Sequence, residues 1–201
     1  MNEAEKLQVE VMNARKVKLG SDHPSTLTAM HNLASIYLDQ GRWDEAEKLQ
    51  VEVMSARKVK LGSDHPSTLA AMHNLASIYR YQGRWDEAEK LLVEVMNATK
   101  VKLGSNHPHT LITIANLALT YKSEKRLDKA MPLLAHAVQS MQQVMGYQHP
   151  TTLHFDCHLN DILNVKQAYQ QQVDQTDGPS TSSIKQVIGN LLKKVKKSRK
   201  M

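Results

Sequence analysis

The chain has 201 residues, a formal net charge of +6 and only 4% aromatic residues. It is rich in Ala, Leu, Met, Glu, Lys and Gln, which favour helices, and no run of β-branched residues between tight turns predicts a strand. We therefore expect an all-α protein. A single cysteine, Cys157, excludes an internal disulfide and is typical of a reducing compartment such as the cytoplasm. No stretch of about 18 apolar residues predicts a membrane-spanning helix.

The positive charge is concentrated at one end of the chain. Residues 184–201 hold seven of the 26 basic residues and none of the 20 acidic ones. The remaining part therefore has 19 bases against 20 acids, a net charge of −1. The net charge therefore gives no reason to expect that residues 1–183 bind nucleic acid.

An internal repeat of 42 residues sets the architecture. The dipeptide His-Pro begins at residues 23, 65, 107 and 149, and SDHPSTLTAMHNLASIY at 21–37 recurs at 63–79 with one change. The copy at 105–121 is more diverged, and a fourth copy begins at residue 147 and soon loses the pattern. Such regularity is typical of stacked units, each of which buries its apolar face against its neighbours.

The first predicted element is a helix over residues 2–20. Its sequence matches 44–62, which is the second helix (helix B) of the following unit, and no matching first helix (helix A) precedes it. We expect residues 2–19 to expose the face that a helix A would cover. Two interpretations stay open: a fragment of a longer array, or a surface that pairs with a second copy.

The next unit, 21–62, is predicted as an antiparallel pair of helices. Helix A begins at Pro24, because proline suits the first helical position, and Gly41 breaks the chain after it. Its apolar stripe has helical spacing and consists of Leu27, Met30, Leu33, Ala34 and Tyr37.

Helix B of this unit is expected to open at Asp44 and to end at Leu61-Gly62. Its predicted buried stripe is Ala46, Leu49, Val53 and Met54, then Val59 or Leu61. The carboxylates Asp44, Glu45 and Glu47 are interpreted as belonging to the helix N-terminus and to solvent-facing sides.

Units 63–104 and 105–146 repeat this plan. Residues 147–172 are predicted as a degenerate capping helix, because polar residues replace part of the apolar stripe, and 173–183 as a linker. Residues 184–201 predict a basic amphipathic helix whose lysines include Lys193, Lys194, Lys196 and Lys197. Three uses stay open for it: covering the end of the stack, binding an anionic membrane or a partner's groove, or forming a nuclear-import or nucleic-acid patch.

The residues also carry a resemblance to a known family. Asn32-Leu33-Ala34-x-x-Tyr37 followed by Gly41-x-Trp43-x-x-Ala46 resembles the tetratricopeptide signature. The junction LGSDHP is similar to the 42-residue variety found in kinesin light chains. The resemblance covers about residues 2–165 and implies a right-handed α-α superhelix whose concave side is lined by helices A.

The resemblance further implies a binding groove for another polypeptide. Its recurring polar residue is Asn32, Asn74 and Asn116, whose amide can pair with a peptide backbone. Neighbouring candidates on the same helices are Thr28, Ser35, Asp39, Ala70, Ser77, Tyr81, Ile112, Leu119 and Ser123. The alternative is that each Asn only bridges helices within the stack. A carboxylate clamp, as used for chaperone tails, lacks its usual Lys and Arg positions.

Other candidate residues are assigned to packing. Trp43 and Trp85 sit at the turn between helices, where they are expected to pack, and His31 and His73 are expected to be half-exposed. The His of each His-Pro occurs once per unit, so these side chains should not converge on one metal ion. A second histidine cluster is His154, Cys157 and His158, for which no second half-site is evident.

No enzyme motif is present, since the sequence contains no Gly-rich phosphate loop, no Gly-x-Ser-x-Gly and no Cys-x-x-Cys. We expect no catalytic residue, no cofactor, no metal and no small-molecule substrate. The leading hypothesis is a cytoplasmic adaptor or scaffold that binds a peptide or partner helix. The alternative hypothesis is a self-associating array with a basic tail for membrane-surface or nucleic-acid attachment.

Overall fold

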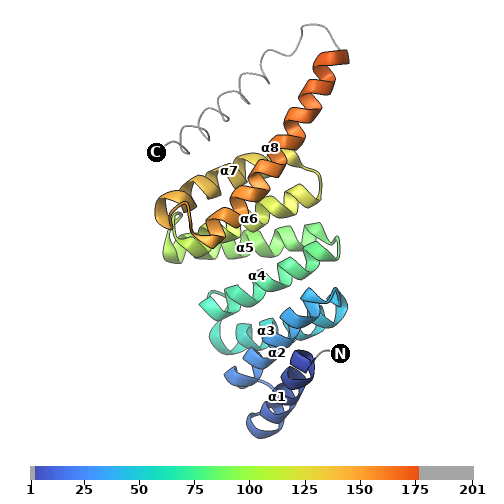
Figure 1. Cartoon of the computed structure of the whole chain (residues 1–201). Coiled ribbons are helices and arrows are strands. Elements are labelled where there is room, and N and C mark those ends of the chain that lie inside the picture. Colours follow the sequence, from blue (N-terminus) through green and yellow to red (C-terminus); the bar gives the residue numbers. More distant parts are fainter. Residues whose placement is uncertain (1–2, 177–201) are drawn as a thin grey trace. The chain divides into compact units, whose positions relative to one another are not determined.

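A computed structural model describes residues 3–176, and the side chains of residues 3–168. This part of the chain consists of eight α-helices and contains no strand (Figure 1). The helices are α1 (Glu3–Leu19), α2 (Pro24–Asp39), α3 (Trp43–Leu61), α4 (Pro66–Tyr81), α5 (Trp85–Leu103), α6 (Pro108–Ser123), α7 (Leu127–Val144) and α8 (Pro150–Thr176).

Each helix from α1 to α6 packs against the next one along the chain, and α4 also contacts α6. The short connections make neighbouring helices antiparallel, as Figure 1 shows for the pairs α2–α3 and α4–α5. The predicted all-α stack of helix pairs is confirmed. The chain divides into two compact units, of which the first ends at Ile162 and the second begins at Leu163. All of the helix pairs belong to the first.

The predicted boundaries agree closely with the observed ones in the first full unit. Helix A begins at Pro24, and helix B begins at Trp43, one residue before the expected start. Gly41 adopts a φ of 72°, the left-handed region in which a side chain would be strained. The end of the chain differs, because α8 continues to Thr176 and includes residues expected to form a linker. The predicted tail, which includes Lys193, Lys194, Lys196 and Lys197, lies outside the described residues.

The junction histidines have a structural role that the sequence analysis missed. His65 precedes α4 in an extended conformation, and its Nδ1 atom accepts a hydrogen bond of 3.1 Å from the backbone N–H of Ser67. Equivalent bonds of 3.2 Å are made by His23, His107 and His149. Each histidine therefore caps the N-terminus of the helix that follows it, where backbone N–H groups lack helical partners.

The predicted core is confirmed for helix A and only in part for helix B. Leu27, Met30 and Leu33 are buried, as are Ala46 and Val53. The extension of the helix B stripe is wrong, because Val59 is 86% exposed and Leu61 is 46% exposed. The physical reason is length: α3 has 19 residues and the preceding helix A has 16, so the last turn of α3 extends past the helices that could cover it.

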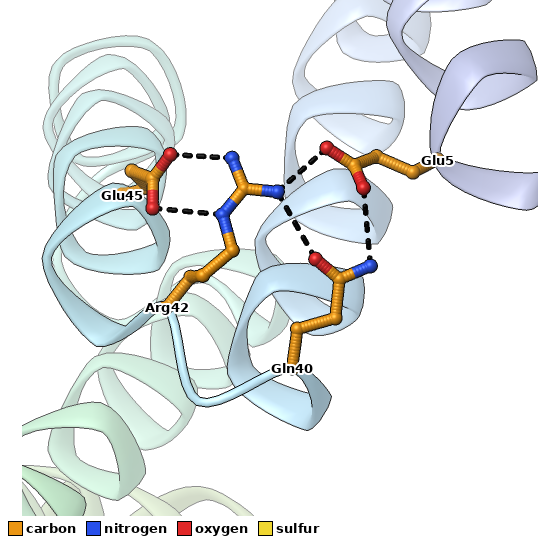
Figure 2. Close-up of polar contacts among 4 residues, drawn as sticks. All are labelled: Glu5, Gln40, Arg42 and Glu45. Atoms are coloured by element: carbon orange, nitrogen blue, oxygen red, sulfur yellow. Dashed lines mark hydrogen bonds and ion pairs between the residues drawn. The ribbon is translucent and has the colours of Figure 1, made fainter. Parts of the chain in front are cut away.

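An arginine at each turn between helices A and B joins one unit to the previous one. Arg42 donates a hydrogen bond of 2.6 Å to Glu5 of α1 and one of 3.0 Å to the Gln40 side chain (Figure 2). It also pairs with Glu45 at the start of α3. Glu5 is only 2% exposed although it is charged, and a buried carboxylate is stable only when it is paired in this way.

The same contact recurs in the next units. Arg84 donates to Glu47 at 2.7 Å, and Arg126 lies 3.2 Å from Glu89. Each of the three arginines also lies over a tyrosine ring of its own helix A, at 4.1, 4.1 and 4.7 Å from the ring centre, which adds a cation–π attraction. The interpretation of Glu47 as a solvent-facing helix N-terminal residue is therefore wrong. Its side chain fixes the position of one unit on the next.

The Glu47 contact makes stability depend on pH. Burial alone would raise the pKa of Glu47, but hydrogen bonds from Arg84 and Gln82 outweigh it and hold the pKa below its ordinary value of 4.5. The lowered pKa means that this stabilisation is complete above pH 4.5 and disappears as the pH falls through the folded-state value.

We predict that Glu47→Gln lowers the free energy of unfolding by about 1 kcal/mol at pH 7, and that this difference shrinks below pH 4.5. Urea unfolding of the wild type and the variant, at pH 7 and at a pH below 4.5, measures this difference. The matched control is Glu52→Gln on the same helix, whose exposed ion pair with Lys16 should contribute less. An effect of Glu47→Gln that is equal at both pH values would contradict the assignment.

Candidate functional site

The outward sides of α2, α4 and α6 form what we call the helix-A surface. All of the groove residues that we proposed from the sequence lie on these three helices: Thr28, Asn32, Ser35, Asp39, Ala70, Asn74, Ser77, Tyr81, Ile112, Asn116, Leu119 and Ser123. Most of these side chains are exposed or half-buried, but Leu119 is buried, with 3% of its surface exposed. Leu119 is therefore a core residue and not part of a groove.

The serine and threonine hydroxyls on this surface bond to their own helices. Thr28 donates to the carbonyl of Pro24 at 2.9 Å, and Ser77 donates to the carbonyl of His73 at 3.3 Å. A hydroxyl oxygen that donates in this way keeps acceptor capacity for an incoming N–H group.

A small hollow of about 120 Å³ lies between α2 and α4. It brings three of the proposed residues together, namely Ser35, Asn74 and Ser77. Gln50 of α3 forms its floor: its side-chain amide donates to the carbonyl of Ala71 at 2.9 Å, and its oxygen lies 3.2 Å from Nδ1 of His31. Gln50 was not among the predicted site residues, because its position in the apolar stripe of helix B favours an apolar residue.

A larger cavity of about 460 Å³ lies between α4 and α6, next to the end of α5. Its lining includes Asn74 and Ile112 of the proposed groove, together with Leu69, His73 and Val95. The two hollows share Asn74, so the helix-A surface is continuous between them.

The recurring asparagines do not have identical surroundings. Asn32 is exposed. Asn74 lies 3.5 Å from Nδ1 of His31 in the preceding helix A, at the limit of a hydrogen bond. Asn116 donates to the carbonyl of Ile112 at 3.0 Å and lies 3.2 Å from Nε2 of His73. The bridging alternative thus applies most clearly to Asn116.

His73 is half-buried, as expected, and the protein holds it neutral. Burial lowers its pKa to about 4, with a smaller contribution from the positive charge of Arg80. At pH 7 its imidazole is therefore uncharged, and Nε2 can accept the hydrogen bond from Asn116 only as the lone-pair nitrogen.

Two basic residues of the helix-A surface were missed by the sequence analysis. Arg80 and Lys122 occupy the position of Leu38 in their units, and Leu38 lines the small hollow. Lys122 pairs with Asp161 at 3.1 Å, and the Arg80 guanidinium lies over the ring of Tyr81 at 5.0 Å. An alignment of the three repeats shows Leu38, Arg80 and Lys122 at one position, and this comparison would have identified the two basic residues.

The aromatic residues at the turns remain partly open. Trp43 is 38% exposed and Trp85 is 37% exposed. The ring of Trp43 stacks on Tyr81 of the next unit, with 6.4 Å between the ring centres. Trp43 therefore packs against the next unit, as expected, and both side chains stay partly exposed.

Within the described residues, no group of three or more His, Cys, Asp or Glu side chains could hold a metal ion. His154 and His158 meet edge to face, 4.9 Å apart between ring centres, and Cys157 is exposed. None of the described helices is long and apolar enough to cross a membrane.

The fold and the 42-residue unit define an α-helical repeat protein. The family model for the tetratricopeptide repeat matches residues 1–58, 28–100 and 67–143. The chain therefore belongs to the tetratricopeptide repeat family, and the predicted repeat superhelix is confirmed. Proteins of this family commonly mediate contacts between proteins.

Solved structures with similar folds include a Podosopora anserina protein described as a kinesin light chain with nearly identical TPR-like repeats. It is 31% identical, with a TM-score of 0.67 over 84% of this chain and 80% of that chain. A variant of that protein with one glutamine changed to methionine is 30% identical, with a TM-score of 0.71 over 99% of this chain and 88% of that chain. BtubC (BKLC) from P. vanneervenii, at 18% identity, shares the fold with a TM-score of 0.68 over 90% and 78% of the two chains. Among curated proteins, no relative matches the chain.

The asparagine environments predict different effects on stability. Asn116→Ala should lower the free energy of unfolding by about 1 kcal/mol, because it removes the two side-chain contacts of a half-buried amide. Asn32→Ala should change it by less than about 0.5 kcal/mol, because Asn32 is exposed. Urea unfolding of the two variants measures both effects. Equal losses of unfolding free energy would contradict the assignment of Asn116 as a bridge between helices.

Proposed function

We propose that this protein is a non-enzymatic adaptor or scaffold that binds a peptide or partner helix on its helix-A surface in the cytoplasm. The observation that carries the proposal is the pair of hollows joined at Asn74, since they lie on one continuous surface of α2, α4 and α6. Binding surfaces of this kind combine hollows for side chains with polar groups that orient the ligand.

The polar groups of this surface suit an extended peptide. An Asn side chain offers both a donor and an acceptor, so Asn32 and Asn74 can pair with a peptide backbone whatever its sequence. The hollows between successive helices A then accept side chains, which would supply selectivity. Trp43 and Tyr81, both partly exposed, border the same surface and offer further apolar contact.

The test uses a defined peptide selected from a display library of random 14-residue peptides against the full chain. We expect Asn32→Ala and Asn74→Ala to weaken its binding about tenfold each, the loss of roughly one hydrogen bond. Lys90→Ala, at an exposed position of α5, is the matched control and should leave binding unchanged. Methylation of the peptide's backbone amides should mimic the Asn variants. Binding that survives both Asn changes would contradict the proposal.

A second candidate function, self-association through residues 2–19, is favoured by one observation. Leu7 is 57% exposed and Val11 is 39% exposed on α1, whereas Val53, the copy of Val11 in α3, is fully buried. An exposed apolar stripe on a helix is a surface on which a second copy could pack. The role of the basic tail in membrane or nucleic-acid attachment stays a prediction, since residues 184–201 lie outside the described part.

Under this second function, the mass measured by sedimentation should rise to that of a dimer with increasing concentration. Val11→Glu should keep the chain monomeric, because it places a charge in the apolar stripe. A monomer at every concentration would exclude self-association through α1 and leave the adaptor function standing.

A further inference from the structure

The cavity of about 460 Å³ between α4, α5 and α6 lies where one unit departs from the others in sequence. Arg15 of α1 donates to the carbonyl of Ser25 at 2.9 Å, and Arg57 of α3 donates to the carbonyl of Ser67 at 3.0 Å. Each arginine thus reaches from a helix B into the first turn of the next helix A. The third copy of this position is Thr99, whose side chain is too short to span the same distance.

The hydrogen bond that the missing arginine would have made is replaced from within. In the third unit, the carbonyl equivalent to those of Ser25 and Ser67 belongs to His109. It accepts a hydrogen bond of 2.8 Å from the hydroxyl of Thr113. The two positions equivalent to Thr113 hold alanine in the other units. Thr99 in turn donates to the carbonyls of Val95 and Met96, at 2.8 and 3.1 Å. A guanidinium group in the cavity would therefore find no free carbonyl of this kind to bond.

Lys102 and His107 of its lining are also hydrogen-bonded, while Asp64, Asn74 and His109 complete its polar part. Lys102 donates to the carbonyl of Asp64 at 2.7 Å, and His107 accepts from the backbone N–H of His109. His73 carries no charge at pH 7, because burial lowers its pKa to about 4. What remains facing the space is largely apolar, and the apolar residues of the lining are Pro66, Leu69, Ala70, Val95, Leu103 and Ile112.

We propose that this cavity, opened by Thr99 in place of the arginine of the other units, is a pocket for an aliphatic side chain of a bound polypeptide. The proposal rests on the proposed function and names the chemistry of its ligand. A chain that pairs with Asn74 passes the mouth of the cavity, because Asn74 is part of its lining. Ile112 strengthens the apolar character, since alanine stands at its copy, Ala70.

The first experiment titrates the full chain with N-acetyl-leucinamide and follows the methyl signals of the cavity by NMR. We expect saturable shifts of Leu69, Val95 and Ile112, and none with N-acetyl-serinamide or N-acetyl-argininamide. Thr99→Arg should weaken leucinamide binding at least tenfold, because it restores the residue that fills this position in the other units. Asn97→Arg is the matched control, since it adds the same charge at an exposed position of the same helix.

Folding of Thr99→Arg is checked by its thermal unfolding, and Ile112→Ala provides a second variant that introduces a residue native to the repeat. We expect Ile112→Ala to weaken leucinamide binding severalfold. Equal binding in the wild type and in Thr99→Arg, equal loss in Asn97→Arg, or a preference for N-acetyl-argininamide would overturn the proposal.

The second experiment uses the library-selected peptide. Thr99→Arg in the chain should reduce the affinity about tenfold, and so should replacement of one aliphatic peptide residue by alanine. The two changes made together should reduce it no further than either one alone. A peptide that depends on Asn32 and Asn74 but is indifferent to Thr99→Arg would overturn the pocket and leave the adaptor function intact. A peptide that is indifferent to all three positions would overturn both. Leucinamide binding with an indifferent peptide would instead identify the cavity as a small-molecule site, which also overturns the proposal.

Discussion

The contact between an interhelical arginine and a carboxylate of the previous helix B fixes the spacing of the units. In the second full unit, Arg84 holds Glu47 at 2.7 Å and lies over the ring of Tyr79, 4.1 Å from its centre. One guanidinium thus joins three helices: the aromatic residue of its own helix A, the start of its own helix B and a carboxylate on the previous one. Small core residues such as Ala46 and Ala88 let the helices approach, but apolar packing alone is not directional. The ion pair supplies the register.

That register places the helices A next to one another and so creates the surface on which we locate binding. The hollows are products of stacking, because each is bounded by two units and neither exists in a single helix pair. They lie at different places along the helices A, since Ser35 and Ser77 line the smaller hollow and Ala70 and Ile112 line the larger one. Near-identical repeats therefore build a uniform frame, and a few substitutions such as Thr99 and Ile112 give one junction a distinct chemistry.

The sequence predicted the frame far better than it predicted the site. Pro24, Gly41 and the 42-residue period defined the helix pairs, because these signals act locally on the backbone. The partner of Glu47 is Arg84, 37 positions away, and nothing local distinguishes it from a solvent-facing acid. Capping by His65 was missed because histidine is an uncommon cap. The exposure of Val59 followed from unequal helix lengths, and the roles of Asn32 and Asn116 differ although their sequence contexts are alike.

The central claim is that another polypeptide lies along α2, α4 and α6. The most direct measurement is paramagnetic broadening of the chain's amide NMR signals by the selected peptide carrying a nitroxide label at one end and then at the other. The account predicts broadening along the helix-A surface, with the affected positions moving from α2 toward α6, or the reverse, when the label changes ends. Broadening confined to the outer sides of α3 and α5 would contradict it.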